Sequence, residues 1–371
     1  MGCERIAVDT SKSVFTLHGV DERGRPILRR DLSRARFEEF LGKTPPTELV
    51  LEACGSSHHW GRVAQALGHK VRLIPPQYVK PFVKRGKNDR NDAEAICEAA
   101  SRPTMRSVPV KSAESQAEAM DLSARDLLVR QRTQLANAVR GHAAEFGVIA
   151  AKGIAQVEPL LAKIADTAMP QAAKDTLAHL GRVIAQLDAQ LAEFDQRLAK
   201  QHKANPVSQR LAAVPGVGPI TALTVATTID PGQFESARHF AAWLGLTPRE
   251  HSTGGRQRLG GAGQGSNDVS RWNASGGGIS RAGNEGLRQL LVVGAMAVIS
   301  HARPGSKTAS PWLLALLERR PRKLAAVALA NKMARIVWAE PAKAPTTSVV
   351  GMPAEGMMAN GTAYRRSPQA A

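Results

Sequence analysis

The chain has 371 residues and is 43% hydrophobic, which allows more than one buried core, so a single small domain is excluded and two or three domains are expected. A formal charge of +18 and an isoelectric point near 10.4 favour polyanionic partners, of which nucleic acid is the leading candidate. The three cysteines have no paired spacing, so we expect neither a disulfide framework nor a zinc ribbon. No long apolar run or signal sequence is recognised, so we expect a cytoplasmic protein.

The sequence pattern of the first part of the chain predicts an α/β region. Strands are predicted in "RIAVDTS", "SVFTLHGV" and "RPILRRDL", then a helix in "SRARFEEFLGK", a strand in "ELVLEAC", a helix in "HHWGRVAQALG" and a strand in "HKVRLIP". The first three strands are closely spaced and should form an antiparallel meander, whereas the later strands alternate with helices and should lie parallel. This mixed order favours an RNase H-like sheet over a Rossmann sheet.

Four carboxylates stand out in this region. Asp9 and Glu52 each end an apolar strand pattern, and adjacent strands could bring them together. Asp89 and Asp92 are three residues apart at the start of a predicted helix and therefore face the same side. Asp89 as an N-cap with Asp92 in the first turn is an equally good explanation of that pair. Gathered on one sheet, all four would repel one another unless cations such as Mg²⁺ or Mn²⁺ neutralised them. Two such ions can catalyse phosphoryl transfer.

Two long helices are predicted between about residues 112 and 203, where Ala, Leu, Gln, Lys and Arg recur with helical spacing. Charge along their length indicates a helical hairpin or a coiled-coil arm that separates two globular parts or joins two subunits. A plain helical bundle fits the pattern equally well.

The second half begins with "VPGVGPITA", which matches the hairpin of a helix-hairpin-helix element. Gly216 and Gly218 would leave backbone N–H groups free to meet DNA phosphates beside a helix N-terminus. The alternative is a tight turn between two packed helices. Helices are also expected in "NEGLRQLLVVGAMAVISHA" and "RKLAAVALANKMARIVWA", ahead of a disordered tail.

A candidate nucleophile lies in the stretch "GLTPREHSTGGRQRLGG". Ser252 stands next to Thr253 and two glycines, and a serine among guanidinium groups could attack a phosphodiester whose charge those groups stabilise. The sequence leaves open which of the two hydroxyls, that of Ser252 or that of Thr253, would react. The alternative is an ordinary loop serine. The cationic residues that could hold a phosphodiester are Arg249, Arg256 and Arg258 here, and Lys87 and Arg90 among the acids.

The order of "AVDTSK", "LEACG", "KNDRNDAEAI", a helical arm, "VPGVGPITA", "FAAWLGLTPREHSTGGRQRLGG" and "ISRAGNEGLRQLLVVGA" resembles the DEDD transposases of insertion-sequence family 110, in particular its 1111 subgroup. The resemblance covers roughly residues 5–339. It departs from the family pattern at residues 262–278, a segment rich in Gly, Ser and Asn that contains Trp272 and separates "RLGG" from "ISR".

The resemblance implies a RuvC-like DEDD catalytic domain at 1–111, a coiled-coil arm at 112–205, a helical transposase domain with the serine at 206–340 and a disordered tail at 341–371. It implies that Asp9, Glu52, Asp89 and Asp92 bind the metal and that Ser252 forms a covalent phosphoserine intermediate. It also implies a bridge RNA that pairs with both DNA partners, and a site shared between the subunits of a homo-oligomer, a dimer or tetramer. Two other functions remain open: a junction-selective nuclease that uses only the acids, and a non-catalytic nucleic-acid-binding protein.

Overall fold

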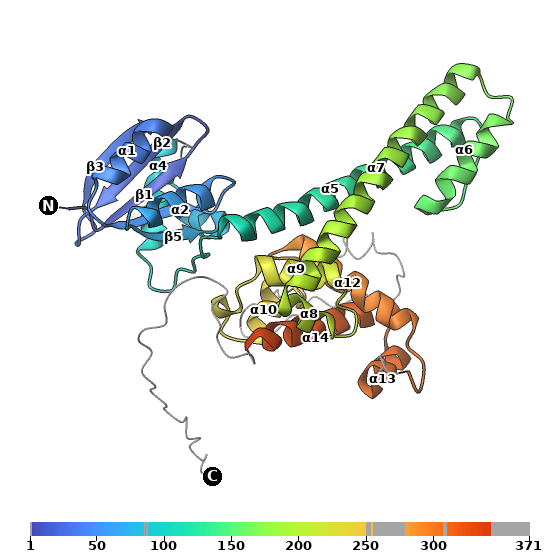
Figure 1. Ribbon diagram of the computed structural model, residues 1–371. Coiled ribbons are helices and arrows are strands. Elements are labelled where there is room, and N and C mark those ends of the chain that lie inside the picture. Colours follow the sequence, from blue (N-terminus) through green and yellow to red (C-terminus); the bar gives the residue numbers. More distant parts are fainter. Residues whose placement is uncertain are drawn as a thin grey trace, which may run out of the picture.

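The structure is a computed structural model that describes residues 2–84, 86, 88–249, 254, 279–306 and 310–342. Five of the predicted site residues lie outside these described residues: Lys87, Ser252, Thr253, Arg256 and Arg258. Trp272 and the tail beyond residue 342 also lie outside them. Figure 1 shows a sheet with its covering helices, two long crossing helices, and a cluster of helices near the C-terminal end of the chain.

A five-stranded mixed sheet forms the N-terminal part, in the order β3-β2-β1-β4-β5. The strands are β1 (Arg5–Thr10), β2 (Val14–Val20), β3 (Pro26–Ser33), β4 (Glu48–Glu52) and β5 (Lys70–Ile74). β1, β2 and β3 pair antiparallel, whereas β4 is parallel to both β1 and β5. The predicted meander followed by parallel strands is therefore confirmed.

Helices cover both faces of this sheet. One face carries α1 (Arg34–Lys43) and α2 (Ser57–Ala66), and the other carries α3 (Pro76–Val79), the short helix η1 (Lys80–Phe82) and α4 (Asp89–Ala100). Because side chains alternate along a strand, Ile6 and Val8 pack in the first core and Ala7 packs under α4. The same alternation turns Asp9 toward the face that α4 covers.

An ion-pair cluster stabilises the opposite end of the sheet. Glu48 at the start of β4 pairs with Arg5 of β1 and, at 3.2 Å, with Arg72 of β5. Burial tends to raise the pKa of Glu48, but hydrogen bonds and charge from Arg5 and Arg72 outweigh it and hold the pKa below its ordinary value. A carboxyl with a lowered folded-state pKa stabilises the fold above its unfolded-state pKa, and this contribution is lost as the pH falls.

We therefore expect Glu48→Gln to lower the free energy of unfolding at neutral pH by about 1–3 kcal/mol, because two partly buried guanidinium groups lose a charged acceptor. The difference from the unmodified protein should shrink as the pH falls below 4.5, the ordinary pKa of a glutamate side chain. Urea unfolding at several pH values measures it. The control is Glu39→Gln on α1, whose partner Lys43 is exposed, and it should change nothing measurable. Equal effects of the two substitutions would contradict the role given to Glu48.

Two long helices follow, as predicted: α5 (Ala113–Glu145) and α7 (Gln171–Ala204), joined through the short η2 (Ile154–Gln156) and α6 (Val157–Ala165). Buried residues recur every seven positions along α7, at Leu177, Ile184, Leu191 and Leu198. Ion pairs cross between the two helices at Arg125–Asp195 and Arg132–Asp188, each 2.6 Å, and at Arg197–Asp121. These contacts pack α7 along α5, and the two helices are here called the arm. Figure 1 shows the end of the arm near α6 projecting from the rest of the molecule.

The remaining helices share one core. They are α8 (Pro206–Ala212), α9 (Pro219–Thr228), η3 (Pro231–Gln233), α10 (Ala237–Trp243), α12 (Glu285–Ser300), α13 (Pro311–Arg319) and α14 (Arg322–Ala342). The predicted helices that became α12 and α14 pack against each other, whereas α13 was not predicted. Within the described part of the chain, no helix is both long enough and apolar enough to cross a membrane.

Candidate functional site

Three of the four predicted acids meet at one edge of the sheet. Carboxylate oxygens of Asp9, Asp89 and Asp92 all lie within 4.8 Å of one another. Asp9 comes from β1, and the other two come from the first turn of α4. Glu52 ends β4 one residue beyond the Val8–Leu51 pair, so it stands beside Asp9 in the parallel register, although it is not a member of the close triplet. Oxygen ligands at such spacing suit a hard divalent cation.

The start of α4 explains why Asp89 and Asp92 face the same way. Asn88 is the N-cap, and its side chain accepts a hydrogen bond from the backbone N–H of Asn91 at 2.8 Å. Asp89 is therefore the first residue of the helix and not its cap, so the capping alternative for Asp89 is wrong. The carboxylates of Asp89 and Asp92 remain one helical turn apart and available to the site.

The four acids repel one another electrostatically. Burial, followed by the charges of Asp92, Asp89 and Glu52, raises the pKa of Asp9 to about 6. Burial and the charge of Asp92 also raise the pKa of Glu52. Both shifts have the sign expected of acids that repel one another in a partly buried place. A bound divalent cation would reverse that repulsion, and the donor set therefore fits such an ion.

A small hydrogen-bonded group ties together the two strands that carry Asp9 and Glu52. The Thr10 hydroxyl contacts the Cys54 thiol at 3.2 Å, and Ser57 at the start of α2 both accepts from the Cys54 N–H and donates to the Cys54 carbonyl. Burial acts to raise the pKa of Cys54, but hydrogen bonds from Thr10, Ser56 and Ser57 leave it lowered. The thiol thus fixes the turn after Glu52 against the end of β1.

We expect Cys54→Ala to weaken the binding of a divalent ion at the carboxylates about tenfold, the size of effect typical when a group that orients metal ligands is lost. Cys54→Ser keeps a hydrogen-bonding group and should restore most of the affinity. Calorimetric titration of Mn²⁺ into each variant tests this. Cys3→Ala, at the other end of β1, serves as the control, and an equal change in both alanine variants would contradict a positioning role for Cys54.

Arg90 directly follows Asp89 in the first turn of α4, and its side chain is exposed. Its guanidinium is 77% exposed and stands 3.5 Å from Asp31 on β3, whose carboxylate also accepts from the Thr16 hydroxyl at 2.9 Å. Thr16 is the register partner of Asp9. Arg90 is therefore held beside the carboxylate edge while most of its surface faces solvent.

The two glycines of the predicted hairpin have different surroundings. Gly216 has a φ of +86° and packs so closely on Gly294 of α12 that a Cβ on Gly294 would lie 1.9 Å from the Gly216 carbonyl oxygen. Close packing against α12 therefore explains why a glycine is present at position 216. Gly218 is the N-cap of α9, and a Cβ there would meet nothing within 4 Å. Of the two glycines, Gly218 is the one that has open space beside its backbone, into which a ligand could approach.

Arg249 is exposed and is the last described residue before the segment that contains Ser252. The two ends of that segment are fastened together, because Pro248 bridges to Ile279 and the Ser280 N–H donates to the Thr247 carbonyl at 2.9 Å. Arg288 of α12 stabilises the region where these two ends meet, and sequence analysis did not identify it. It is 8% exposed and donates to the carbonyls of Leu244 and Ala282. The sequence feature that could have identified Arg288 is the charged residue within the largely apolar run "GLRQLLVV".

Comparison with known proteins agrees with these features. A family model for DEDD transposases of the IS110 type matches residues 6–147, and a family model described as the transposase IS116/IS110/IS902 family matches residues 208–273. A putative transposase, y4pF/y4sB, of Sinorhizobium fredii is 53% identical over 90% of this chain and 83% of its own length. A probable family 20 transposase of Pseudomonas aeruginosa is 46% identical over 91% and 97%. The transposase for insertion sequence element IS1111A of Coxiella burnetii is 39% identical over 90% and 88%.

Proposed function

Because this chain belongs to the IS116/IS110/IS902 family of insertion-sequence transposases, we propose that it cuts and rejoins DNA strands with a carboxylate-held divalent ion and a serine nucleophile. Its class is that of a DNA-cutting and rejoining enzyme, and DNA is its partner. The observation that carries the proposal is the triplet of Asp9, Asp89 and Asp92, with oxygens within 4.8 Å of one another.

Asp9, Glu52, Asp89 and Asp92 are the residues that would hold Mg²⁺ or Mn²⁺. Such ions, when bound, stabilise charge on the attacking and leaving oxygens of a phosphodiester. The protein's own contribution is to hold the carboxylates close together despite their repulsion. Arg90 lies next to them, and Lys87 precedes the same helix in sequence, so both are proposed to hold the phosphate backbone.

Ser252 is proposed as the nucleophile. Its hydroxyl oxygen would form a bond to phosphorus as the bond to a deoxyribose oxygen breaks, and the serine proton would leave while the departing oxygen gains one. The positive charges of Arg249, Arg256 and Arg258 would stabilise the charge that develops on the phosphate. Gly218 at the start of α9 is proposed to place backbone N–H groups against DNA, with Gly216 shaping the turn.

Oligomerisation through the arm is proposed to bring acids of one subunit to the serine of another. The arm projects from the rest of the chain in Figure 1. Near its tip the apolar side chains of Phe146 and Ile149 are 48% and 69% exposed, which favours contact with another protein surface. The domain limits at 111, 205 and 340, and guidance by a bridge RNA whose pairing would select the DNA, belong to the same proposal.

One experiment tests the serine and separates the alternatives. A duplex that carries an element end is incubated with Mg²⁺, the protein and RNA transcribed from the noncoding part of the element, and products are resolved under denaturing conditions. The unmodified protein should give a covalent protein–DNA adduct and joined strands, and Ser252→Ala should lose both, whereas Thr253→Ala should keep both. Continued cutting by Ser252→Ala without an adduct would indicate a junction nuclease. The absence of any metal-dependent reaction in the unmodified protein would indicate a protein that only binds nucleic acid.

A further inference from the structure

A large open groove of about 1100 Å³ lies where the sheet, the base of the arm and the C-terminal helices meet. Its wall on the sheet side includes Ala53, the residue after Glu52, and Pro75, which follows β5. The groove therefore starts at the same edge of the sheet as the acidic residues. Its volume is at the upper end of the roughly 300–1,000 Å³ typical of small-molecule pockets, so it has room for a segment of a chain.

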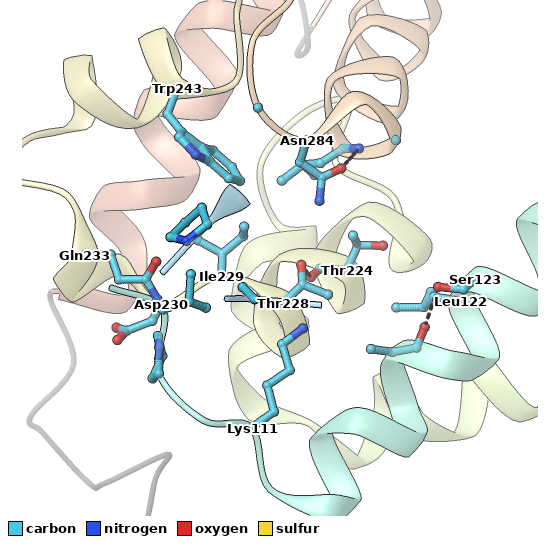
Figure 2. Close-up of a pocket in the computed structure, with 18 of the residues that line it drawn as sticks. Lys111, Leu122, Ser123, Thr224, Thr228, Ile229, Asp230, Gln233, Trp243 and Asn284 are labelled. Atoms are coloured by element: carbon cyan, nitrogen blue, oxygen red, sulfur yellow. Dashed lines mark hydrogen bonds between the residues drawn. The ribbon is translucent and has the colours of Figure 1, made fainter. Parts of the chain in front are cut away.

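Three side chains from different parts of the molecule reach into this groove, as Figure 2 shows: Lys111 before α5, Trp243 at the end of α10 and Asn284 at the start of α12. The indole of Trp243 is held by Phe234 at 5.3 Å and by Phe240, which stacks at 6.1 Å with an interplanar angle of 17°. A ring fixed in this way is suited to stack on a planar ligand.

Lys111 is one of the cationic residues that line the groove, with Arg106 and Arg125. Its backbone is anchored, because its N–H donates to His58 at 3.2 Å and its carbonyl accepts from Arg62 at 2.9 Å. Burial lowers the pKa of its ammonium, and among the described residues no carboxylate forms an ion pair with it. Figure 2 shows the side chain extended toward Thr228 on the groove wall. A half-buried ammonium without a counter-ion is a site for an anionic group.

Asn284 supplies a polar edge. Its side-chain oxygen accepts from the Leu287 N–H at 2.9 Å as the cap of α12, which leaves the amide nitrogen as a donor on the groove side. A flat apolar ring, an amide and an ammonium group without an ion pair match the base, the base edge and the phosphate of a nucleotide. A base paired inside a duplex cannot stack on a protein ring, so the matching ligand is unpaired.

We propose that this groove binds an unpaired stretch of nucleic acid, with a base stacked on Trp243 and a phosphate at Lys111, next to the carboxylate edge. The proposal rests on the proposed function only for the class of ligand. Both DNA and RNA offer the same bases and phosphates, so the two sources are distinguished by experiment.

The test measures binding of short oligothymidylate, oligouridylate and a DNA duplex by fluorescence anisotropy, in EDTA, over a range of salt concentrations. Asp9→Asn protein is the background, so that loss of chemistry and loss of groove binding are separate results. Trp243→Leu should weaken single-strand binding about tenfold, and Trp243→Phe should keep most of it. Lys111→Gln should weaken it less and make the slope of log K against log salt shallower by about 0.7.

Matched controls are Trp312→Leu on α13, whose ring lies under Lys332, and Lys43→Gln on α1. Both should bind single strands like the background protein, and duplex binding should be unchanged in all variants. Stronger binding of the DNA or of the RNA oligomer identifies the source and supports the proposal. Unchanged single-strand binding in both Trp243→Leu and Lys111→Gln would overturn it, as would an equal loss of duplex binding. If Trp243→Leu does not fold, Lys111→Gln and Asn284→Ala decide the result in the same way.

Discussion

Asp9→Asn is expected to lower the rate of metal-dependent DNA cleavage by about a thousandfold, with the fold retained. The substitution keeps the shape of the side chain but removes a charged oxygen from the centre of the triplet with Asp89 and Asp92. A metal ion contributes several kcal/mol to stabilising a phosphoryl-transfer transition state, and about 4 kcal/mol corresponds to three orders of magnitude. Single-turnover cleavage at saturating Mg²⁺ measures the effect.

The control for Asp9→Asn is Glu98→Gln, which makes the same change of charge at the far end of α4. Glu98 is exposed and pairs only with Arg102 within the described structure, so cleavage should stay within about twofold of the unmodified rate. A comparable loss in Glu98→Gln would mean that total charge, and not the triplet, determines the rate.

Asp9→Asn should also change how the free energy of unfolding depends on pH in the absence of metal. The pKa of Asp9 is about 6 in the folded protein and near 3.8 when the residue is unperturbed. Between these values the folded state binds more protons than the unfolded state, so stability should fall as the pH rises from about 4 to about 6. The loss should be roughly 1–2 kcal/mol, because the group is partly exposed and solvent screens the repulsion. Asp9→Asn should remove this slope in urea unfolding curves.

Gly294→Ala is expected to destabilise the C-terminal helices by about 3 kcal/mol. The new methyl group would lie 1.9 Å from the Gly216 carbonyl oxygen, so α12 and the turn before α9 would have to separate. Overpacking of this kind costs about 1–3 kcal/mol and sometimes more, and here the contact is with backbone that cannot rotate away. Thermal unfolding followed by circular dichroism provides the measurement.

The comparison for Gly294→Ala is Gly141→Ala in α5. Gly141 is also inside a helix, but a Cβ there would meet nothing within 4 Å, so this change should stabilise the protein by up to about 1 kcal/mol. If the two substitutions had the same effect, the close crossing of Gly216 and Gly294 would not exist in solution.

Local pattern was sufficient to predict the sheet and most of the acidic site. The strand runs that end on Asp9 and Glu52 place both residues at one edge, because the strands are adjacent and parallel. The spacing of Asp89 and Asp92 likewise predicts a shared face. The N-cap could not be decided in this way, since Asn88 and Asp89 are both good capping residues and only the backbone path selects Asn88.

Features that depend on contacts between residues far apart in the chain could not be predicted from the sequence. Gly216 fits a DNA-binding hairpin equally well until its contact with Gly294 is seen. Arg288 reads as one polar residue in an apolar helix, and its role appears only when the carbonyls of Leu244 and Ala282 lie beside it. The groove is formed by three parts of the chain, and none of their local patterns shows that Lys111 and Trp243 line one space.

The most direct test of the acidic site is calorimetric titration of Mn²⁺ into the protein without DNA, at a pH well above the pKa of Asp9. We predict binding in the unmodified protein and a loss of at least tenfold in affinity in Asp9→Asn and in Asp92→Asn, with Glu98→Gln unchanged. Equal Mn²⁺ affinity in all four proteins would contradict the assignment of this carboxylate edge as the metal site.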